Sequence, residues 1–284
     1  MKPELLYDAK ATIGEGPVWD AHTGTLYWID ILNKRVYADA DILLELDETI
    51  GCIAPRKSGG LILTKRFSFW TCETNPLRTT FLSALENEPV NNRFNDGKCD
   101  PRGRFLAGTM DMGEKDPNGS LYSFDGKSVL KLLDGVTISN GLTWSPDCKT
   151  FYYIDTPTRI VRAFDYDLET GAIASPRDAV RVPESLGWPD GMTSDMQGNL
   201  WIAMWGGAQV TKWDPHTGQL LDRIPVPAKN VSSCVFGGKN MNELYITSAR
   251  VGLDEANLNQ YPLTGGVFRL ETNVEGMPTF AFAG

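Results

Sequence analysis

Four oxygen-bearing side chains occupy one position of an internal sequence repeat. In each copy the side chain is followed by an Asp or Ser five residues later, a turn, and a short apolar strand, and the four are Glu15, Asn95, Asn140 and Asp190. Equivalent positions of a repeat fall at equivalent places in a repeated fold. The repeat therefore predicts that these side chains converge. Their oxygens are the ligands that hard divalent cations such as Ca²⁺, Mg²⁺ and Mn²⁺ prefer.

Glu15, Asn140 and Asp190 together would supply two carboxylates and one amide oxygen. Such a set leaves coordination positions open for water and substrate, which a catalytic metal requires. We expect one divalent cation, which could be Ca, Mg, Mn, Zn or Fe; the absence of His and Cys ligands gives no reason to favour zinc or iron. The alternative is that Asn140-Gly141 and Asp190-Gly191 are simply turn dipeptides.

Both histidines lie in turn sequences of the form Asp-x-His-Thr-Gly, at His22 and His216. We expect them to be exposed on outer loops, so a Ser-His-Asp or Cys-His mechanism has no base. Any hydrolysis would then depend on the metal and a carboxylate. Asp190 is the best candidate to position or deprotonate a water molecule, in addition to binding the cation.

Two further residues could contact a substrate. Arg93 lies close to Asn95 and could donate hydrogen bonds to a hydroxylated or anionic molecule, although a surface salt bridge is the alternative. Trp205 ends a strand-like segment and could stack on a sugar face, with core packing as the alternative.

The elements that position these residues are short strands. Counting two weaker copies at Gly51 and Ser233, the repeated positions are separated by 36, 44, 45, 50 and 43 residues. These lengths fit a four-stranded blade, and six blades fill the chain. We predict an all-β, six-bladed β-propeller over residues 1–284 as one domain, with the repeated positions facing the central channel from one end. The strand around residues 5–7 should pair with the last blade and close the ring.

Composition narrows the classes of partner. The net charge of −9 and the lack of a basic run argue against nucleic acid as a partner. No apolar segment is long enough to cross a membrane, and the N-terminus lacks the apolar core of a signal peptide. Five widely spaced cysteines predict reduced, mostly buried thiols, so we expect a cytoplasmic protein. The sequence makes no prediction of oligomeric state.

Several motifs together resemble the SMP-30/gluconolactonase/LRE-like family. They extend from Gly14-Glu15-Gly16-Pro17-Val18-Trp19 to Gly265-Gly266-Val267-Phe268, through Asn92-Arg93-Phe94-Asn95-Asp96-Gly97, Ala107-Gly108-Thr109-Met110, Ile138-Ser139-Asn140-Gly141-Leu142, Pro189-Asp190-Gly191-Met192 and Cys234-Val235-Phe236-Gly237-Gly238. The resemblance covers nearly the whole chain. It implies a six-bladed propeller, in agreement with the repeat count.

The resemblance also implies roles for individual residues. One divalent metal would be held by Glu15, Asn140 and Asp190, with Asn95 touching substrate or water and Arg93 binding sugar hydroxyls. Asp190 would be the general base of lactone hydrolysis. One departure is that this chain has Gly113 where regucalcin-type members carry a substrate-binding Glu; Glu114 is adjacent, in a loop (111–118) that differs from theirs. Sugar preference therefore does not transfer from the family.

We predict a metal-dependent carboxylic-ester hydrolase that opens a 1,4- or 1,5-aldonolactone to its aldonic acid. Its partner would be a small sugar lactone. Two alternatives are a promiscuous esterase or phosphotriesterase on the same metal platform, and a non-catalytic calcium-binding regulator.

Overall fold

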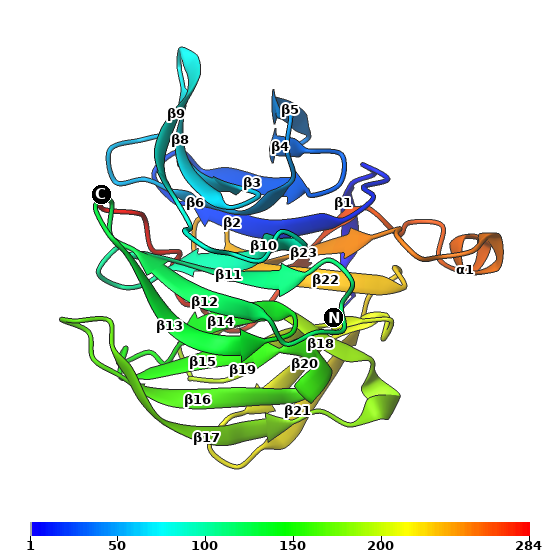
Figure 1. The fold of residues 1–284 in the computed structure, drawn as a ribbon. Helices are drawn as coiled ribbons and strands as arrows, with labels where there is room; N and C mark the ends of the chain where they lie inside the picture. Colours follow the sequence, from blue (N-terminus) through cyan, green and yellow to red (C-terminus); the bar gives the residue numbers. More distant parts are fainter. Residues whose placement is uncertain (1) are drawn as a thin grey trace.

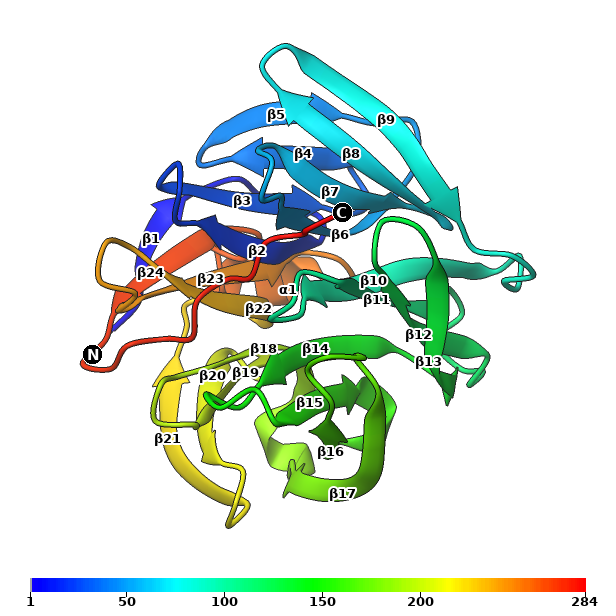
Figure 2. The same ribbon diagram turned by 90° about the vertical axis from the view of Figure 1, so that its left-hand side faces the viewer.

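Residues 2–284 are described by a computed structural model, and nearly all of the regular structure is antiparallel β-strand. Six four-stranded sheets are arranged around a ring (Figures 1 and 2). The all-β, six-bladed propeller predicted from the repeat is therefore confirmed. The helices are short: the 3₁₀ turns η1 (Thr156–Thr158) and η2 (Glu184–Leu186), and α1 (Glu255–Gln260). Within residues 2–284, no helix is long and apolar enough to cross a membrane.

The first three blades follow the chain in order. The first contains β2 (Gly14–Asp20), β3 (Thr25–Asp30), β4 (Arg35–Ala38) and β5 (Asp41–Glu45). The second contains β6 (Ile50–Pro55), β7 (Leu61–Lys65), β8 (Ser68–Thr74) and β9 (Leu77–Ala84). The third contains β10 (Asn92–Cys99), β11 (Phe105–Asp111), β12 (Gly119–Phe124) and β13 (Val129–Val136).

The remaining blades include the one that closes the ring. The fourth contains β14 (Ser139–Trp144), β15 (Thr150–Asp155), β16 (Ile160–Tyr166) and β17 (Ile173–Arg181). The fifth contains β18 (Trp188–Ser194), β19 (Leu200–Trp205), β20 (Gln209–Asp214) and β21 (Gln219–Pro225). The sixth contains β22 (Asn230–Gly237), β23 (Glu243–Ala249), β24 (Val267–Glu271) and the N-terminal strand β1 (Glu4–Tyr7).

Apolar side chains gather between the blades. Six hydrophobic clusters are formed by residues 2–284, and each joins two successive blades, including the sixth and the first. The innermost strands β2, β6, β10, β14, β18 and β22 contact one another in a closed cycle. Most residues of these inner strands are buried, because the strands pack against neighbouring blades, although several of the buried residues are polar.

The ring is closed from two directions. β1 pairs antiparallel with β24, as the sequence predicted, so an N-terminal strand completes the last blade. The segment 274–284 crosses the ends of the innermost strands: Met277 N–H donates to the Ser194 carbonyl at 2.9 Å and Phe282 N–H donates to the Pro55 carbonyl at 2.8 Å. Figure 2 shows this C-terminal segment in red. We call the end of the channel that it covers the tail end, and the opposite end the site end.

Candidate active site

Each innermost strand begins at the site end and carries a β-bulge at or beside the repeated position. The pairing register shifts between Glu15 and Val18, between Phe94 and Gly97, between Asn140 and Leu142, and between Pro189 and Met192, with equivalent shifts in β6 and β22. A bulge inserts a residue into one strand and redirects its side chain, and bulges are common beside active sites. The sequence repeat therefore corresponds to a β-bulge that recurs in each blade and orients one side chain of that blade.

The glycines after these side chains allow neighbouring blades to approach closely. A Cβ atom on Gly141 would lie 2.7 Å from the backbone oxygen of Asp190, and one on Gly191 would lie 2.1 Å from the Ser233 Oγ. Only glycine fits at such distances. Because Asn140-Gly141 and Asp190-Gly191 lie within β14 and β18, the alternative that they form turns is wrong.

Two aspartates, the buried Asp30 and the half-buried Asp155, hold the chain that leads into the site. Asp30, at the end of β3, accepts hydrogen bonds from the backbone amides of Thr12 (2.8 Å) and Ile13 (3.1 Å), just before Glu15. Asp155 occupies the equivalent place at the end of β15 and accepts from the amides of residues 137 and 138, at 3.2 and 2.9 Å, just before Asn140. An aspartate that accepts from two backbone amides therefore fixes the start of two of the strands that carry site residues.

Three buried carboxylates face the channel with few donors. Glu15 and Asp190 are 7% and 6% exposed, and Asp96, which was not predicted from the sequence, is 8% exposed. Glu15 accepts the amide of Gly16 at 2.6 Å and Asp96 accepts that of Gly97 at 2.7 Å. Asp190 likewise receives the amide of the glycine that follows it. Each carboxylate thus gains a backbone donor from the bulge that positions it.

These backbone donors do not offset the loss of water. Burial, followed by the negative charge of Asp96, raises the pKa of Glu15 from 4.5 to about 8. Burial, followed by the charges of Glu15 and Asp96, raises the pKa of Asp190 well above its usual value. Burial also raises the pKa of Asp96, although the Lys98 ammonium opposes that shift. The positive charges of Arg93 and Lys98 therefore do not offset the burial of the three carboxylates.

A directed series of hydrogen bonds joins the polar residues of β10 and β14. Arg93 Nη1 donates to Asn95 Oδ1 at 2.7 Å, and Asn95 Nδ2 donates to Asn140 Oδ1 at 3.0 Å and to the Ser139 carbonyl at 2.8 Å. Asn140 Nδ2 donates to Thr156 Oγ1 at 2.8 Å, and this hydroxyl donates to the Pro189 carbonyl at 2.8 Å. The series ends beside Asp190. Arg93 is therefore buried in the site rather than placed in a surface salt bridge.

Glu114 and Trp205 lie at the edge of this site. Glu114 is exposed in the loop between β11 and β12, and among nearby negative charges it acts most strongly to raise the pKa of Arg93, which burial lowers to about 10. Trp205 is the last residue of β19, half-buried, and pairs with the exposed Trp188 at the start of β18. His22 and His216 are exposed, as predicted.

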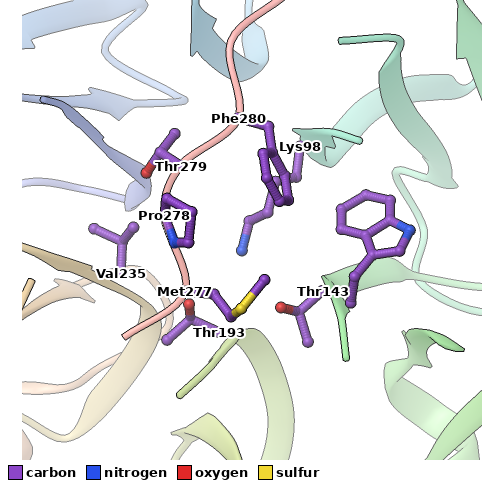
Figure 3. A pocket seen from close by; sticks show the side chains of 9 residues that line it. Lys98, Thr143, Thr193, Val235, Met277, Pro278, Thr279 and Phe280 are labelled. Atoms are coloured by element: carbon purple, nitrogen blue, oxygen red, sulfur yellow. The ribbon is translucent and has the colours of Figure 1, made fainter. Parts of the chain in front are cut away.

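Asp96, Lys98 and Thr156 are residues of the site that were not predicted from the sequence. The signal for Asp96 was present, since Asp96-Gly97 has the same carboxylate-glycine form as Asp190-Gly191. Lys98 Nζ donates to the Met192 carbonyl at 2.9 Å, across the channel, and lies beside a cavity of about 20 Å³ at the tail end (Figure 3). Nothing in the sequence near Thr156 indicates its contact with Asn140.

The oxygen atoms of Glu15, Asn140 and Asp190 are of the kind that binds a divalent cation. Asn140 Oδ1 faces Asn95 on the channel side and keeps a second lone pair, and Glu15 and Asp190 are buried carboxylates with one backbone donor each. Within residues 2–284, no three His, Cys, Asp or Glu side chains are grouped as metal ligands. The expected ligands Glu15, Asn140 and Asp190 are not a group of that kind, because the third oxygen comes from the Asn140 amide.

The fold and this site define a class: six-bladed propellers with buried acidic side chains at one end of the central channel. The family model described as the SMP-30/Gluconolactonase/LRE-like region matches residues 13–250, and the chain belongs to that family. It is 38% identical to the regucalcin of Danio rerio over 297 aligned positions, covering 100% of this chain and 99% of that protein.

Two solved structures extend the comparison. A calcium-binding protein, regucalcin, from Agrobacterium tumefaciens is 26% identical with a TM-score of 0.93, covering 99% of this chain and 97% of the other. A gluconolactonase from Xanthomonas campestris is 26% identical with a TM-score of 0.76, covering 94% and 88%.

Proposed function

We propose that this protein is a metal-dependent hydrolase that opens an aldonolactone, with a 1,4- or 1,5-lactone ring, to the aldonic acid. The observation that carries the proposal is the pair of buried, under-compensated carboxylates, Glu15 and Asp190, beside the Asn140 amide oxygen at the site end of the channel. Membership of the family and the likeness to a gluconolactonase support a sugar lactone as the substrate class.

In this proposal Glu15, Asn140 and Asp190 would hold one divalent cation. When bound, the cation would act as a Lewis acid that polarises the lactone carbonyl and stabilises negative charge on its oxygen. The proposal allows Ca²⁺, Mg²⁺, Mn²⁺, Zn²⁺ or Fe²⁺ as the metal, and the calcium-binding relative makes Ca²⁺ the first to test.

The protein side chains would divide the remaining work. The raised pKa of Asp190 suits a group that accepts a proton from water near neutral pH. Arg93 and Asn95 would bind the sugar hydroxyls, since Arg93 keeps N–H donors beyond those that contact Asn95 and the Phe94 carbonyl. Glu114 and Trp205 would contact the substrate at the rim. The free cysteines suit a reducing compartment, and we propose a cytoplasmic location.

The test is acid release from a panel of aldonolactones, measured with a pH indicator on metal-stripped protein and after each cation is restored singly. We expect turnover only with a cation present. Asp190→Asn should lower turnover by about 10²- to 10⁴-fold, the usual contribution of a positioned base. The same change at the exposed outer residue Asp222 is the matched control and should leave turnover unchanged.

A protein that binds a cation tightly but hydrolyses no lactone would overturn the proposal and favour the calcium-binding regulator. Higher turnover of aryl esters or organophosphates than of lactones would favour the esterase alternative. The buried Arg93 and the half-buried Asn95 beside the carboxylates favour catalysis over regulation, because a structural cation does not need donors for a substrate.

A further inference from the structure

The Asn140 side chain has a defined orientation, and the reason lies outside the acidic cluster. An asparagine amide presents an oxygen on one side and an amino group on the other, so a 180° flip would exchange an acceptor for two donors. Only the oxygen can bind a cation. The orientation of this amide therefore decides whether β14 contributes a ligand to the proposed metal site, on which this inference rests.

The hydrogen-bond series fixes the orientation from both ends. Arg93 can only donate, so the atom of Asn95 that it contacts at 2.7 Å is the oxygen. Asn95 Nδ2 also donates to the Ser139 carbonyl at 2.8 Å, which confirms its identity and requires an acceptor on Asn140. At the other end, the Pro189 carbonyl can only accept, so the Thr156 hydroxyl donates there and accepts from Asn140 Nδ2.

Thr156 is placed to act on two site strands. It is buried, at 9% exposure, and its backbone amide donates to the Ile138 carbonyl at 3.2 Å, just before Asn140. Its hydroxyl accepts from the Asn140 amide and donates to the residue before Asp190. Without the hydroxyl, Asn140 Nδ2 would lose its acceptor, and a flipped amide would set its amino group against Asn95 Nδ2.

We propose that Thr156 is a positioning residue that holds the Asn140 amide with its oxygen on the channel side, so that β14 presents an oxygen ligand to a divalent cation. Hydrogen bonds to metal ligands from outside the coordination sphere orient those ligands, and their loss usually costs ten- to hundredfold in metal affinity. Thr156 touches neither substrate nor metal in this assignment.

The experiment is calorimetric titration of metal-stripped protein with Ca²⁺, Mn²⁺ and Zn²⁺ separately, together with the melting temperature without metal. Thr156→Val should bind each cation that the wild type binds about ten- to hundredfold more weakly. Thr156→Ser keeps the hydroxyl and should bind close to wild type. Thr211→Val is the matched control: Thr211 is also buried, and its hydroxyl accepts from Trp213 Nε1 at 2.8 Å in β20, so metal affinity should not change.

The Asn140→Asp variant separates an effect on the orientation of the residue 140 side chain from a general loss of structure. Asn140→Asp presents a carboxylate oxygen in either orientation, so adding Thr156→Val to it should weaken binding much less than in the wild type. Equal losses in both backgrounds, wild-type affinity in Thr156→Val, or no cation binding by the wild type would each overturn the inference. Because the readout is metal affinity, a wild type that binds cations but hydrolyses no lactone would overturn only the proposed function.

Discussion

At the scale of single residues, the site is defined by an excess of buried negative charge. Glu15, Asp96 and Asp190 face two buried or half-buried cations, Arg93 and Lys98. Burial lowers the pKa of both cations, and the carboxylates partly restore it. Buried charges are tolerated only when they are paired or bind a metal. A divalent cation would therefore stabilise this arrangement, and in its absence protons should do so.

That imbalance predicts how the stability of metal-free protein depends on pH. The pKa of Glu15 is raised to about 8, so the folded state holds a proton that the unfolded state releases above about pH 4.5. A raised folded-state pKa contributes stability that is lost as the pH rises toward that value. With EDTA present, we expect the melting temperature to fall between pH 5 and pH 8. Thermal melts at a series of pH values would measure this.

Two controls accompany this prediction. Glu15→Gln cannot titrate and should flatten the fall, and a saturating cation should remove it because the metal displaces the protons. The cation should therefore stabilise the protein most at pH 8. A melting temperature in EDTA that stays constant or rises across this window would contradict the raised pKa of the cluster.

At the scale of secondary-structure elements, bulges position the site and the C-terminal segment closes the opposite end. The bulges aim residues 15, 95, 140 and 190, while residues 274–284 connect the ends of β18 and β6. Phe282 fixes this segment: it is 1% exposed and stacks on Phe124 of β12, with ring centroids 5.8 Å apart. The segment therefore contributes to the core between the second and third blades.

Phe282→Ala should destabilise the protein by about 3 to 5 kcal/mol, the range for removing a fully buried aromatic ring. Denaturant unfolding of the metal-bound protein would measure the change. Phe81→Ala is the matched control, because Phe81 is 52% exposed on β9, and its loss should cost less than about 1 kcal/mol. If both variants had equal stability, the C-terminal segment would not be part of the cooperative core.

At the scale of the whole molecule, the ring depends on strands far apart in the sequence. β1 forms the outer edge of the sixth blade, where Leu5 pairs with Phe268 and Arg269 contacts Glu4 at 2.6 Å. β24 is thereby paired on both sides. An unpaired strand edge is a template for association with another chain.

Deleting residues 1–8 should therefore lower the melting temperature and expose the free edge of β24. We expect the shortened protein to form concentration-dependent oligomers, which size-exclusion chromatography with light scattering would detect. Glu4→Gln, which breaks only the exposed ion pair with Arg269, is the control and should leave mass and melting temperature nearly unchanged. A shortened protein with the mass and melting temperature of the full chain would show that β1 is dispensable for closure.

The sequence by itself determined the blade count and the strand positions, and the pairing of the N-terminal strand with the last blade followed from the fold class that they predict. It could do so because a repeat imposes the same turn and strand chemistry in every copy, and that signal is local. The grouping of Glu15, Asn95, Asn140 and Asp190 at one position of the repeat was local information of the same kind. Their roles as ligands, base and substrate contacts stay predictions.

Only the tertiary structure decided what surrounds these residues. Thr156 reaches Asn140 and Pro189, and Lys98 reaches Met192 from another blade, through contacts across 16 to 94 positions of sequence. No periodicity encodes such pairs, because they depend on how the blades pack around the channel. The same holds for the raised pKa values of Glu15 and Asp190, since desolvation is a property of the closed ring and not of either residue.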